Sequence, residues 1–423
     1  MKKFFFGLFI IYTSLFGQQN SDLPPLHSRL PFESEIISLP RTDDYFSVYY
    51  TFRVPYKLLV FERKSESFEA EFRVIVEIMD ENSVLVARDI NDSRITVSTF
   101  EETNDNSLYL QNFLEFKIKA GEYEVAAIIS DRNSSGELPI KPKKITLEKN
   151  KSVQHPLVII AQDFLCEEKK AFILANAGGK VPFSGDKYNL IIPLADTSVT
   201  ELNIIVENED ETIISTKVDE SYIIPIGVVD CDKHISVTSS SENVSLRHFV
   251  VRNVNEKLKE GDVILKVSND DNSFEEEFHS EVVWFNKPFS LMDPEKAIEY
   301  LNFVESDSIV YSMLKESSSD YPELLNNYWL KYDPTPETVY NEIMFEYYNR
   351  VDYAIKEFRG ISKDNGAKTD RGVVYIKFGK PDKIERTSNP QGQMIEIWNY
   401  SDQERKFLFI DRKGTGNFTL TEN

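Results

Sequence analysis

The stretch that decides the fold covers residues 68–78 and reads FEAEFRVIVEI. Apolar residues occupy every second position from Phe68 to Ile78, and most of the positions between them are charged. Successive side chains of a strand point to opposite faces, so this pattern places an apolar face on a core and a charged face in water. The stretch therefore predicts one strand of a half-buried antiparallel sheet.

The same alternation recurs on both sides of this stretch. Residues 46–54, 114–118 and 123–129 each carry apolar side chains at every second position. Turns rich in Asn, Asp, Ser and Gly separate them, a spacing typical of an antiparallel sandwich. Residues 119–123, KAGEY, resemble the corner before a late strand in immunoglobulin-like and fibronectin-like modules. We therefore predict a first β-sandwich over residues 41–150.

Two proline-containing segments flank this sandwich. Residues 18–40 are rich in Pro, Ser and Leu and predict an extended lead-in without a core of its own. Residues 141–152 are basic, and we expect them to form a connector. Residues 153–287 then predict a second β-sandwich, whose expected strands cover residues 190–194, 202–206, 222–226, 249–251, 263–267 and 282–285.

The pattern changes after Pro288, where helix starts appear. Asp293 is followed by Pro294, which places an N-cap acceptor before a first-turn proline. This arrangement predicts a helix that runs to about Val304. Residues 290–423 are therefore expected to form an α+β domain, with helices first and a small antiparallel sheet after them.

Two further helices are expected in this domain. A capping-box-like Asp-x-x-Glu at residues 320–323 leads into a helix over residues 324–329. The segment DPTPE at residues 333–337 opens a third, longer helix to about Phe358. Its apolar residues recur at steps of three and four, which predicts a seam packed on another element.

Strands are expected to return after Gly360. Val374, Ile376 and Phe378 alternate with other residues and predict one strand face. The remaining strands of this small sheet are expected at residues 395–400, 407–410 and 418–420. The fold class is thus mainly β with a C-terminal α+β domain: two antiparallel sandwiches, then helices and a small antiparallel sheet.

The N-terminus predicts export. Lys2 and Lys3 precede an apolar run from Phe4 to Phe16, and Gly17 offers a small residue for cleavage. This order is typical of a secretory signal peptide over residues 1–17. The run is too short for a spanning helix, which needs about 20 apolar residues. We expect a periplasmic or extracellular protein with no transmembrane span in the mature chain.

Composition narrows the possible partners. The chain has 423 residues, 41% of them hydrophobic, and a net charge of −22. Such a surface repels phosphate backbones, so nucleic acid is excluded as a partner. Cys166 and Cys231 are 65 positions apart, too far for a CxxC redox or zinc motif. In an exported chain they are candidates for a disulfide, and the sequence leaves open whether they pair.

The C-terminal third carries four distinctive segments in a fixed order, at residues 328–336 (YWLKYDPTP), 348–354 (YNRVDYA), 369–372 (TDRG) and 379–382 (GKPD). Together they resemble a known family, the GWxTD domain, found in exported proteins of Bacteroidetes-like bacteria. The motif that names the family reads GAKTD at residues 366–370, without its tryptophan. The resemblance implies an architecture and an exported, cell-envelope location, and it brings no established reaction.

The family motif is the candidate site. Its residues are Gly366, Thr369, Asp370, Arg371 and Gly372. Asp and Thr side chains commonly bond to nearby backbone N–H groups, which favours a structural corner. Arg371 is then expected to pair with a carboxylate on the long helix, and the two candidates are Glu342 and Glu346.

Two functions follow from this cluster. The first is a non-enzymatic binding or adaptor protein of the cell envelope, with a protein or envelope component as partner. The alternative is an envelope hydrolase whose carboxylates around Asp370 carry out acid–base chemistry. The five histidines are scattered without HExxH spacing, so no metal site or other cofactor is expected.

Overall fold

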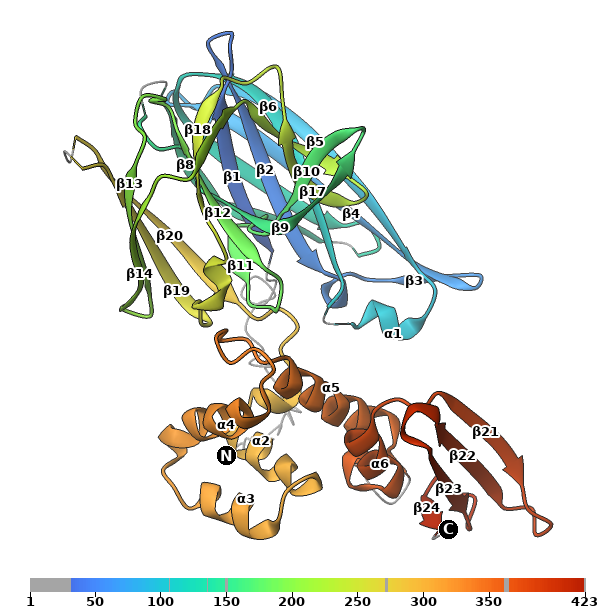
Figure 1. The fold of residues 1–423 in the computed structure, drawn as a ribbon. Coiled ribbons are helices and arrows are strands. Elements are labelled where there is room, and N and C mark those ends of the chain that lie inside the picture. The colour runs from blue at the N-terminus through green and yellow to red at the C-terminus, as the bar shows by residue number, and fades with distance from the viewer. Residues whose placement is uncertain are drawn as a thin grey trace, which may run out of the picture.

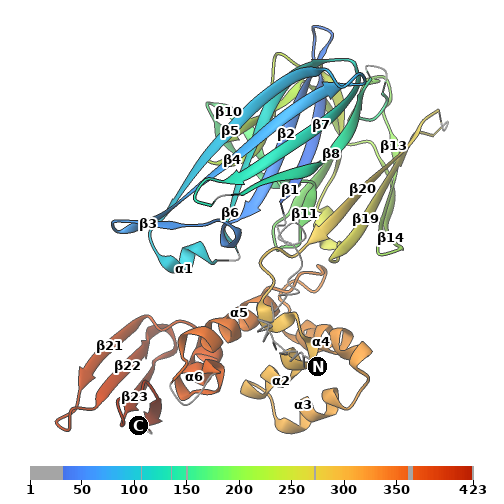
Figure 2. The same ribbon diagram turned by 180° about the vertical axis from the view of Figure 1, so that it is seen from behind.

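The computed structural model describes residues 32–105, 107–134, 136–148, 151–270, 273–360 and 365–421. A block of sheets holds the N-terminal part, and helices with a small sheet follow it (Figure 1; Figure 2). The predicted fold class is confirmed. The predicted leader, residues 1–17, lies outside the described residues.

Two sheets enclose the first core. One has the strand order β1-β2-β6, and the other has the order β3-β4-β7-β8 with β5 also paired to β4. On β4, Phe72, Val74 and Val76 are at most 4% exposed, as the period-two pattern predicts. The bounds are β1 (Glu33–Pro40), β2 (Tyr45–Pro55), β3 (Glu62–Lys64), β4 (Ser67–Asp80), β5 (Leu85–Val97), β6 (Tyr109–Lys119), β7 (Gly121–Asp131) and β8 (Gly136–Leu147). A single helical turn, α1 (Phe100–Thr103), joins β5 to β6.

Two segments that were not expected to form strands are strands of this sandwich. Residues 33–40 of the predicted lead-in form β1, paired with β2. Residues 141–147 of the predicted connector continue β8, paired with β7. β8 lies at the edge of its sheet, where prolines are tolerated and lysines reach water. The basic, proline-containing composition therefore marks an edge strand here.

The second sandwich also has two sheets. Their orders are β15-β18-β12-β9-β10-β17-β16 and β11-β20-β19-β13-β14. All pairs are antiparallel except the short β11–β20 pair, which is parallel. The bounds are β9 (Leu157–Cys166), β10 (Lys169–Leu174), β11 (Lys180–Pro182), β12 (Tyr188–Leu194), β13 (Leu202–Asn208), β14 (Glu211–Val218), β15 (Ser221–Ile224), β16 (Ile226–Cys231), β17 (His234–Ser239), β18 (Leu246–Val251), β19 (Gly261–Ser268) and β20 (Glu275–Val283).

The two sandwiches pack directly on each other. A separate apolar cluster joins Ile37 and Tyr49 of the β1-β2-β6 sheet to Leu157 and Ile159 of the seven-stranded sheet. The β1-β2-β6 sheet is therefore covered on both faces. Its strand β2 is buried along nearly its whole length, including the polar Thr51 at 0% exposure.

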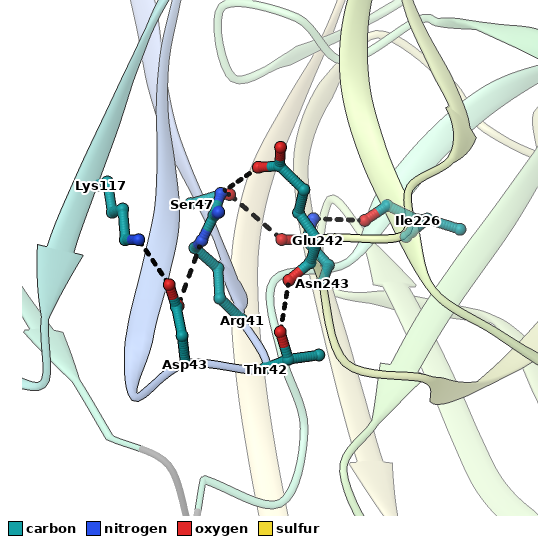
Figure 3. Close-up of polar contacts among 8 residues, drawn as sticks. All are labelled: Arg41, Thr42, Asp43, Ser47, Lys117, Ile226, Glu242 and Asn243. Carbon is teal, nitrogen blue, oxygen red and sulfur yellow. Dashed lines mark hydrogen bonds and ion pairs between the residues drawn. The ribbon is translucent and has the colours of Figure 1, made fainter.

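Polar contacts close one end of this interface (Figure 3). The Arg41 guanidinium lies 2.7 Å from the Glu242 carboxylate. The Ser47 hydroxyl donates to the Asn243 side-chain carbonyl at 3.1 Å, and the Asn243 amide donates to the Ile226 carbonyl at 2.6 Å. Ser47 and Asn243 are buried, so these bonds are shielded from water and hold the sandwiches in one orientation.

Within the described residues after β20, five α-helices and a four-stranded sheet form the C-terminal part. The bounds are α2 (Pro294–Tyr300), α3 (Asp307–Leu314), α4 (Tyr321–Trp329), α5 (Glu342–Glu357), α6 (Asp370–Phe378), β21 (Lys383–Ser388), β22 (Met394–Tyr400), β23 (Arg405–Asp411) and β24 (Phe418–Thr421). Among the described residues no helix has both the length and the apolar character that a membrane crossing requires.

Only some of the predicted helix starts agree with the structure. Asp293 caps α2 as expected, accepting from the N–H of Lys296 at 3.2 Å. α4 begins at Tyr321, but Asp320 makes no cap bond. The long helix α5 starts at Glu342 under an Asn341 cap, and the proline-rich residues 333–340 before it are not helical. α3 was not predicted.

The largest correction concerns residues 370–378. They were expected to be a strand in their second half and form α6 instead. Val374 and Ile376 are both buried, because α6 packs on α5 and on β24. A short helix covered on two sides carries apolar residues at steps of two, which imitate a strand.

Candidate functional site

The motif residues form the start of α6. The Thr369 hydroxyl accepts from the Gly372 N–H at 3.1 Å and donates to the Gly366 carbonyl at 2.7 Å. Thr369 is therefore an N-cap, the position where Thr side chains stabilise helices. It is only 5% exposed, so its hydroxyl is not presented to a ligand.

The two motif glycines allow close backbone contact. A Cβ atom at Gly366 would lie 2.2 Å from the Ala354 carbonyl oxygen of α5. A Cβ atom at Gly372 would lie 2.1 Å from the Gly366 carbonyl oxygen. Both distances are far inside van der Waals contact with backbone atoms that cannot swing away. Gly366 is thus required where the motif crosses the end of α5, and Gly372 is required where the first turn of α6 lies against Gly366 and Ala367.

Arg371 is enclosed by the C-terminal sheet. Its Nη1 lies 3.3 Å from Oε2 of Glu396 on β22, and its Nη2 donates to the Gly416 carbonyl at 3.1 Å. The guanidinium carbon lies 4.2 Å from the ring centre of Phe418 on β24. These contacts tie the first turn of α6 to the sheet.

Glu396 gathers three partners at this point. Besides Arg371, it accepts from Nε of Arg386 at 3.0 Å and from Nε1 of Trp398 at 3.3 Å. Glu396 is 4% exposed, so its charge is compensated inside the domain. A carboxylate engaged in this way is a structural anchor and is poorly placed for acid–base chemistry.

The expected partners of Arg371 lie elsewhere. Glu346 pairs with Arg350 at 2.7 Å, and Glu342 accepts from the Thr335 hydroxyl at 3.2 Å. The prediction failed because it placed Arg371 on a loop beside α5. As the second residue of α6, Arg371 extends toward β22 and β24.

Asp370 also serves the fold. Its Oδ2 accepts from the Leu420 N–H of β24 at 2.8 Å. This bond satisfies a backbone donor of the last strand and adds a second tie between α6 and the sheet. The polar groups of the motif are thus used to join α5, α6 and β22–β24.

The family comparison covers the same elements. A GWxTD domain model matches residues 267–422. The chain contains a GWxTD domain. The match begins upstream of the predicted boundary at residue 290 and includes β20 of the second sandwich. At the tryptophan position of the family name stands Ala367, which is fully buried, so no indole reaches a surface there.

Comparison with curated proteins finds no match. Among solved structures, the chain is similar to the titin immunoglobulin tandem domains, with 11% identity over 59% of this chain and 96% of the titin chain and a TM-score of 0.14. At this TM-score the likeness adds nothing to the description of the fold.

Cys166 and Cys231 are joined by a disulfide. Cys166 ends β9 and Cys231 ends β16, in the seven-stranded sheet of the second sandwich. The bond links two strands that are separated in the sheet by β10 and β17. The spacing of the two cysteines in the sequence could not show this proximity.

A cavity lies where the two sandwiches and the segment entering the GWxTD helices meet. Its volume is about 230 Å³. Arg53 of β2 lines it from the first sandwich, Tyr188 of β12 from the second, and Phe285 from the segment after β20. It joins a second cleft of about 500 Å³, with which it shares Ser107, Tyr109, Gln111 and His234.

Polar groups gather on one wall of this cavity. The Ser184 hydroxyl lies 2.6 Å from the Tyr188 hydroxyl and donates to the Asp186 carboxylate at 3.1 Å. Burial raises the pKa of the Tyr188 phenol, so the group remains neutral and retains its proton. Asp186 provides an acceptor beside it.

Arg53 carries no motif that marks it as a site residue. In β2, Ser47, Tyr49, Thr51 and Arg53 alternate with the apolar residues, a pattern that predicts a solvent face. That face is covered by the second sandwich, which leaves Arg53 only 6% exposed. The alternation of a single strand cannot reveal that a second sheet covers its polar side.

Proposed function

We propose that this protein is exported to the bacterial cell envelope and acts there by binding a protein or envelope component, without catalysis. One observation carries the proposal: the charged groups of the family motif, Asp370 and Arg371, are engaged by Leu420, Glu396 and Gly416 of the same chain. A catalytic carboxylate needs access to a substrate. Asp370 and Arg371 instead make intramolecular contacts that join α6 to the sheet.

Two observations support export. The leader sequence has the charged, apolar and small-residue order of a signal peptide. The Cys166–Cys231 disulfide suits an oxidising compartment, because cytosolic thiols are kept reduced. Both are compatible with a periplasmic or an extracellular location.

Exposed side chains on the GWxTD domain support a binding role. Phe289, Met292 and Tyr311 have exposed fractions of 73%, 61% and 62%. Exposed apolar side chains mark a protein interface when they form a patch, and the proposal takes these three as parts of one. We place the docking surface on this helical part and expect a protein partner with an apolar patch of its own.

Affinity capture tests this proposal. The tagged mature protein is recovered from the envelope fraction of its own cell, and the bound material is quantified. We expect a stoichiometric protein partner whose recovery falls when Phe289 and Tyr311 are changed to Ser. Phe100→Ser is the matched control, because Phe100 is 62% exposed on the first sandwich. Hydrolysis of envelope glycan by the wild type and not by Asp370→Asn would support the hydrolase instead.

A further inference from the structure

Arg53 is a buried cation whose nearest interacting carboxylate, Glu33, forms its ion pair with another residue. Its side chain makes no hydrogen bond or ion pair within the described chain, and its Nε is fully buried. Two aromatic rings enclose it: the guanidinium carbon lies 3.5 Å from the ring centre of Tyr109 and 3.9 Å from that of Phe285. Stacking recovers part of the cost of desolvation, but the buried Nε donor of the guanidinium has no hydrogen-bond partner among the described residues.

The strands on either side of β2 supply no ion pair to Arg53. Glu33 of β1 stands directly opposite Arg53 in the register and interacts with it electrostatically, but its carboxylate is paired with Lys180 at 3.6 Å. On the other side Gln111 of β6 stands opposite Arg53 and is neutral. Cross-strand neighbours share one face of a sheet, so both residues border the guanidinium.

The cavity beside Arg53 has the features of a small-molecule site. It is concave, has aromatic walls in Phe183, Phe285 and Tyr109, and holds convergent polar groups in Ser184, Asp186 and Tyr188. Binding sites commonly combine an apolar lining with a few placed polar groups. The guanidinium supplies a fork of donors that matches a carboxylate in geometry and charge.

We infer that this cavity binds a hydroxylated carboxylate, such as a sugar acid, with its carboxylate on Arg53 and its hydroxyl groups on Asp186, Ser184 and Tyr188. One guanidinium balances one negative charge, whereas a phosphate monoester would bring nearly two beside the Asp186 carboxylate. The adjoining 500 Å³ cleft leaves room for the ligand to continue as the end of a longer glycan. This site is separate from the docking surface proposed above and does not depend on it.

Calorimetric titration of the full mature chain tests the inference with three matched probes: glucuronate, glucose and glucose 6-phosphate. We expect saturable binding of glucuronate, at least about tenfold tighter than that of glucose, because a charge-assisted bond is lost in the neutral sugar. The absence of saturable glucuronate binding would overturn the inference. Tighter binding of glucose 6-phosphate than of glucuronate would overturn the claim that the ligand's anionic group is a carboxylate.

Two variants connect the binding to Arg53. Arg53→Gln is expected to weaken glucuronate binding at least about tenfold, while Arg63→Gln on the exposed strand β3 leaves it unchanged. Gln111→Glu keeps the side-chain shape and places a carboxylate opposite Arg53. It should raise the melting temperature and also abolish glucuronate binding, because the guanidinium is then occupied. A folded Gln111→Glu protein with wild-type affinity would contradict the inference.

Discussion

The guanidinium of Arg371 lies 3.3 Å from the carboxylate of Glu396, with exposed side-chain fractions of only 12% and 5%. This ion pair joins the start of α6 to the second strand of the C-terminal sheet. Breaking a buried pair leaves one charge without compensation, which costs more than the pair itself contributes. The pair therefore offers a direct test of the structural role assigned to the GWxTD motif.

Glu396→Gln should destabilise the GWxTD domain by about 3 kcal/mol, since it leaves Arg371 buried without its counter-charge. Arg386→Gln should cost less than about 1 kcal/mol, because its side chain is 67% exposed. Denaturant unfolding followed by tryptophan fluorescence measures both. All three tryptophans, Trp284, Trp329 and Trp398, lie in or beside this domain, so the signal reports on it. Equal stability of the two variants would contradict the assignment.

The motif glycines give an independent test. Gly366→Ala and Gly372→Ala each force a methyl group to within about 2.2 Å of a carbonyl oxygen, and we expect a loss of about 3 kcal/mol or more in the free energy of unfolding. Gly136→Ala is the control, because nothing lies within 4 Å of its added Cβ. Denaturant unfolding curves give the free energy of unfolding of all three variants for comparison with the wild type. Motif variants as stable as the control would show that α6 does not need this close approach.

Stability should depend on pH through His248. This residue is fully buried, and burial lowers the pKa of its imidazole to about 4. The contribution of the neutral imidazole to the free energy of unfolding is complete above about pH 6.5, the pKa of histidine in the unfolded chain. It is lost as the pH falls toward 4, and the loss amounts to about 3 kcal/mol. Burial lowers the pKa of His155 as well, so the wild-type slope contains both residues.

The difference between wild type and His248→Gln isolates the contribution of His248. Its Nε2 lies 2.9 Å from the Ile224 carbonyl, and the Gln amide can donate the same bond. Free energies of unfolding measured from pH 7 to pH 4 should fall less steeply for this variant. His279→Gln, at an exposed position, should follow the wild-type slope. Parallel curves for wild type and His248→Gln would rule out the buried neutral histidine.

The disulfide should contribute to the second sandwich. It closes a separation of 65 residues, for which loop-closure entropy gives about 4 kcal/mol. Calorimetric melting of Cys166→Ser/Cys231→Ser should therefore show a lower transition temperature than the wild type. Reductant should lower the wild-type transition and leave that of the double variant unchanged. A wild-type transition insensitive to reductant would mean that the bond contributes little.

The strands were largely predictable and their surroundings were not. The alternation from Phe68 to Ile78 specifies a strand with one buried face, and β4 has that form. The same alternation in β2 suggested a solvent face that is in fact covered. Local periodicity records which residues share a face, whereas the number of faces that are buried depends on strands distant in the sequence.

The site could be located from the motif but not assembled from it. Thr369 caps a helix by bonding to Gly372, three residues away, so its capping role is local. The partner of Arg371 lies on β22, and the misassigned α6 hid the direction in which the side chain points. No local motif surrounds Arg53 in the sequence. The rings that pack on it come from Tyr109 of β6 and from Phe285, which are both distant in the sequence.

The proposed export underlies both the proposed location and the expectation that the disulfide persists in the mature protein. Intact mass measurement of the natively expressed protein, after alkylation of free thiols, tests it most directly. The account predicts that the protein outside the cytosol has lost about 17 residues, begins near Gln18, and carries no alkyl group on Cys166 or Cys231. A cytosolic protein that retains Met1 and the whole leader, with both cysteines alkylated, would contradict it.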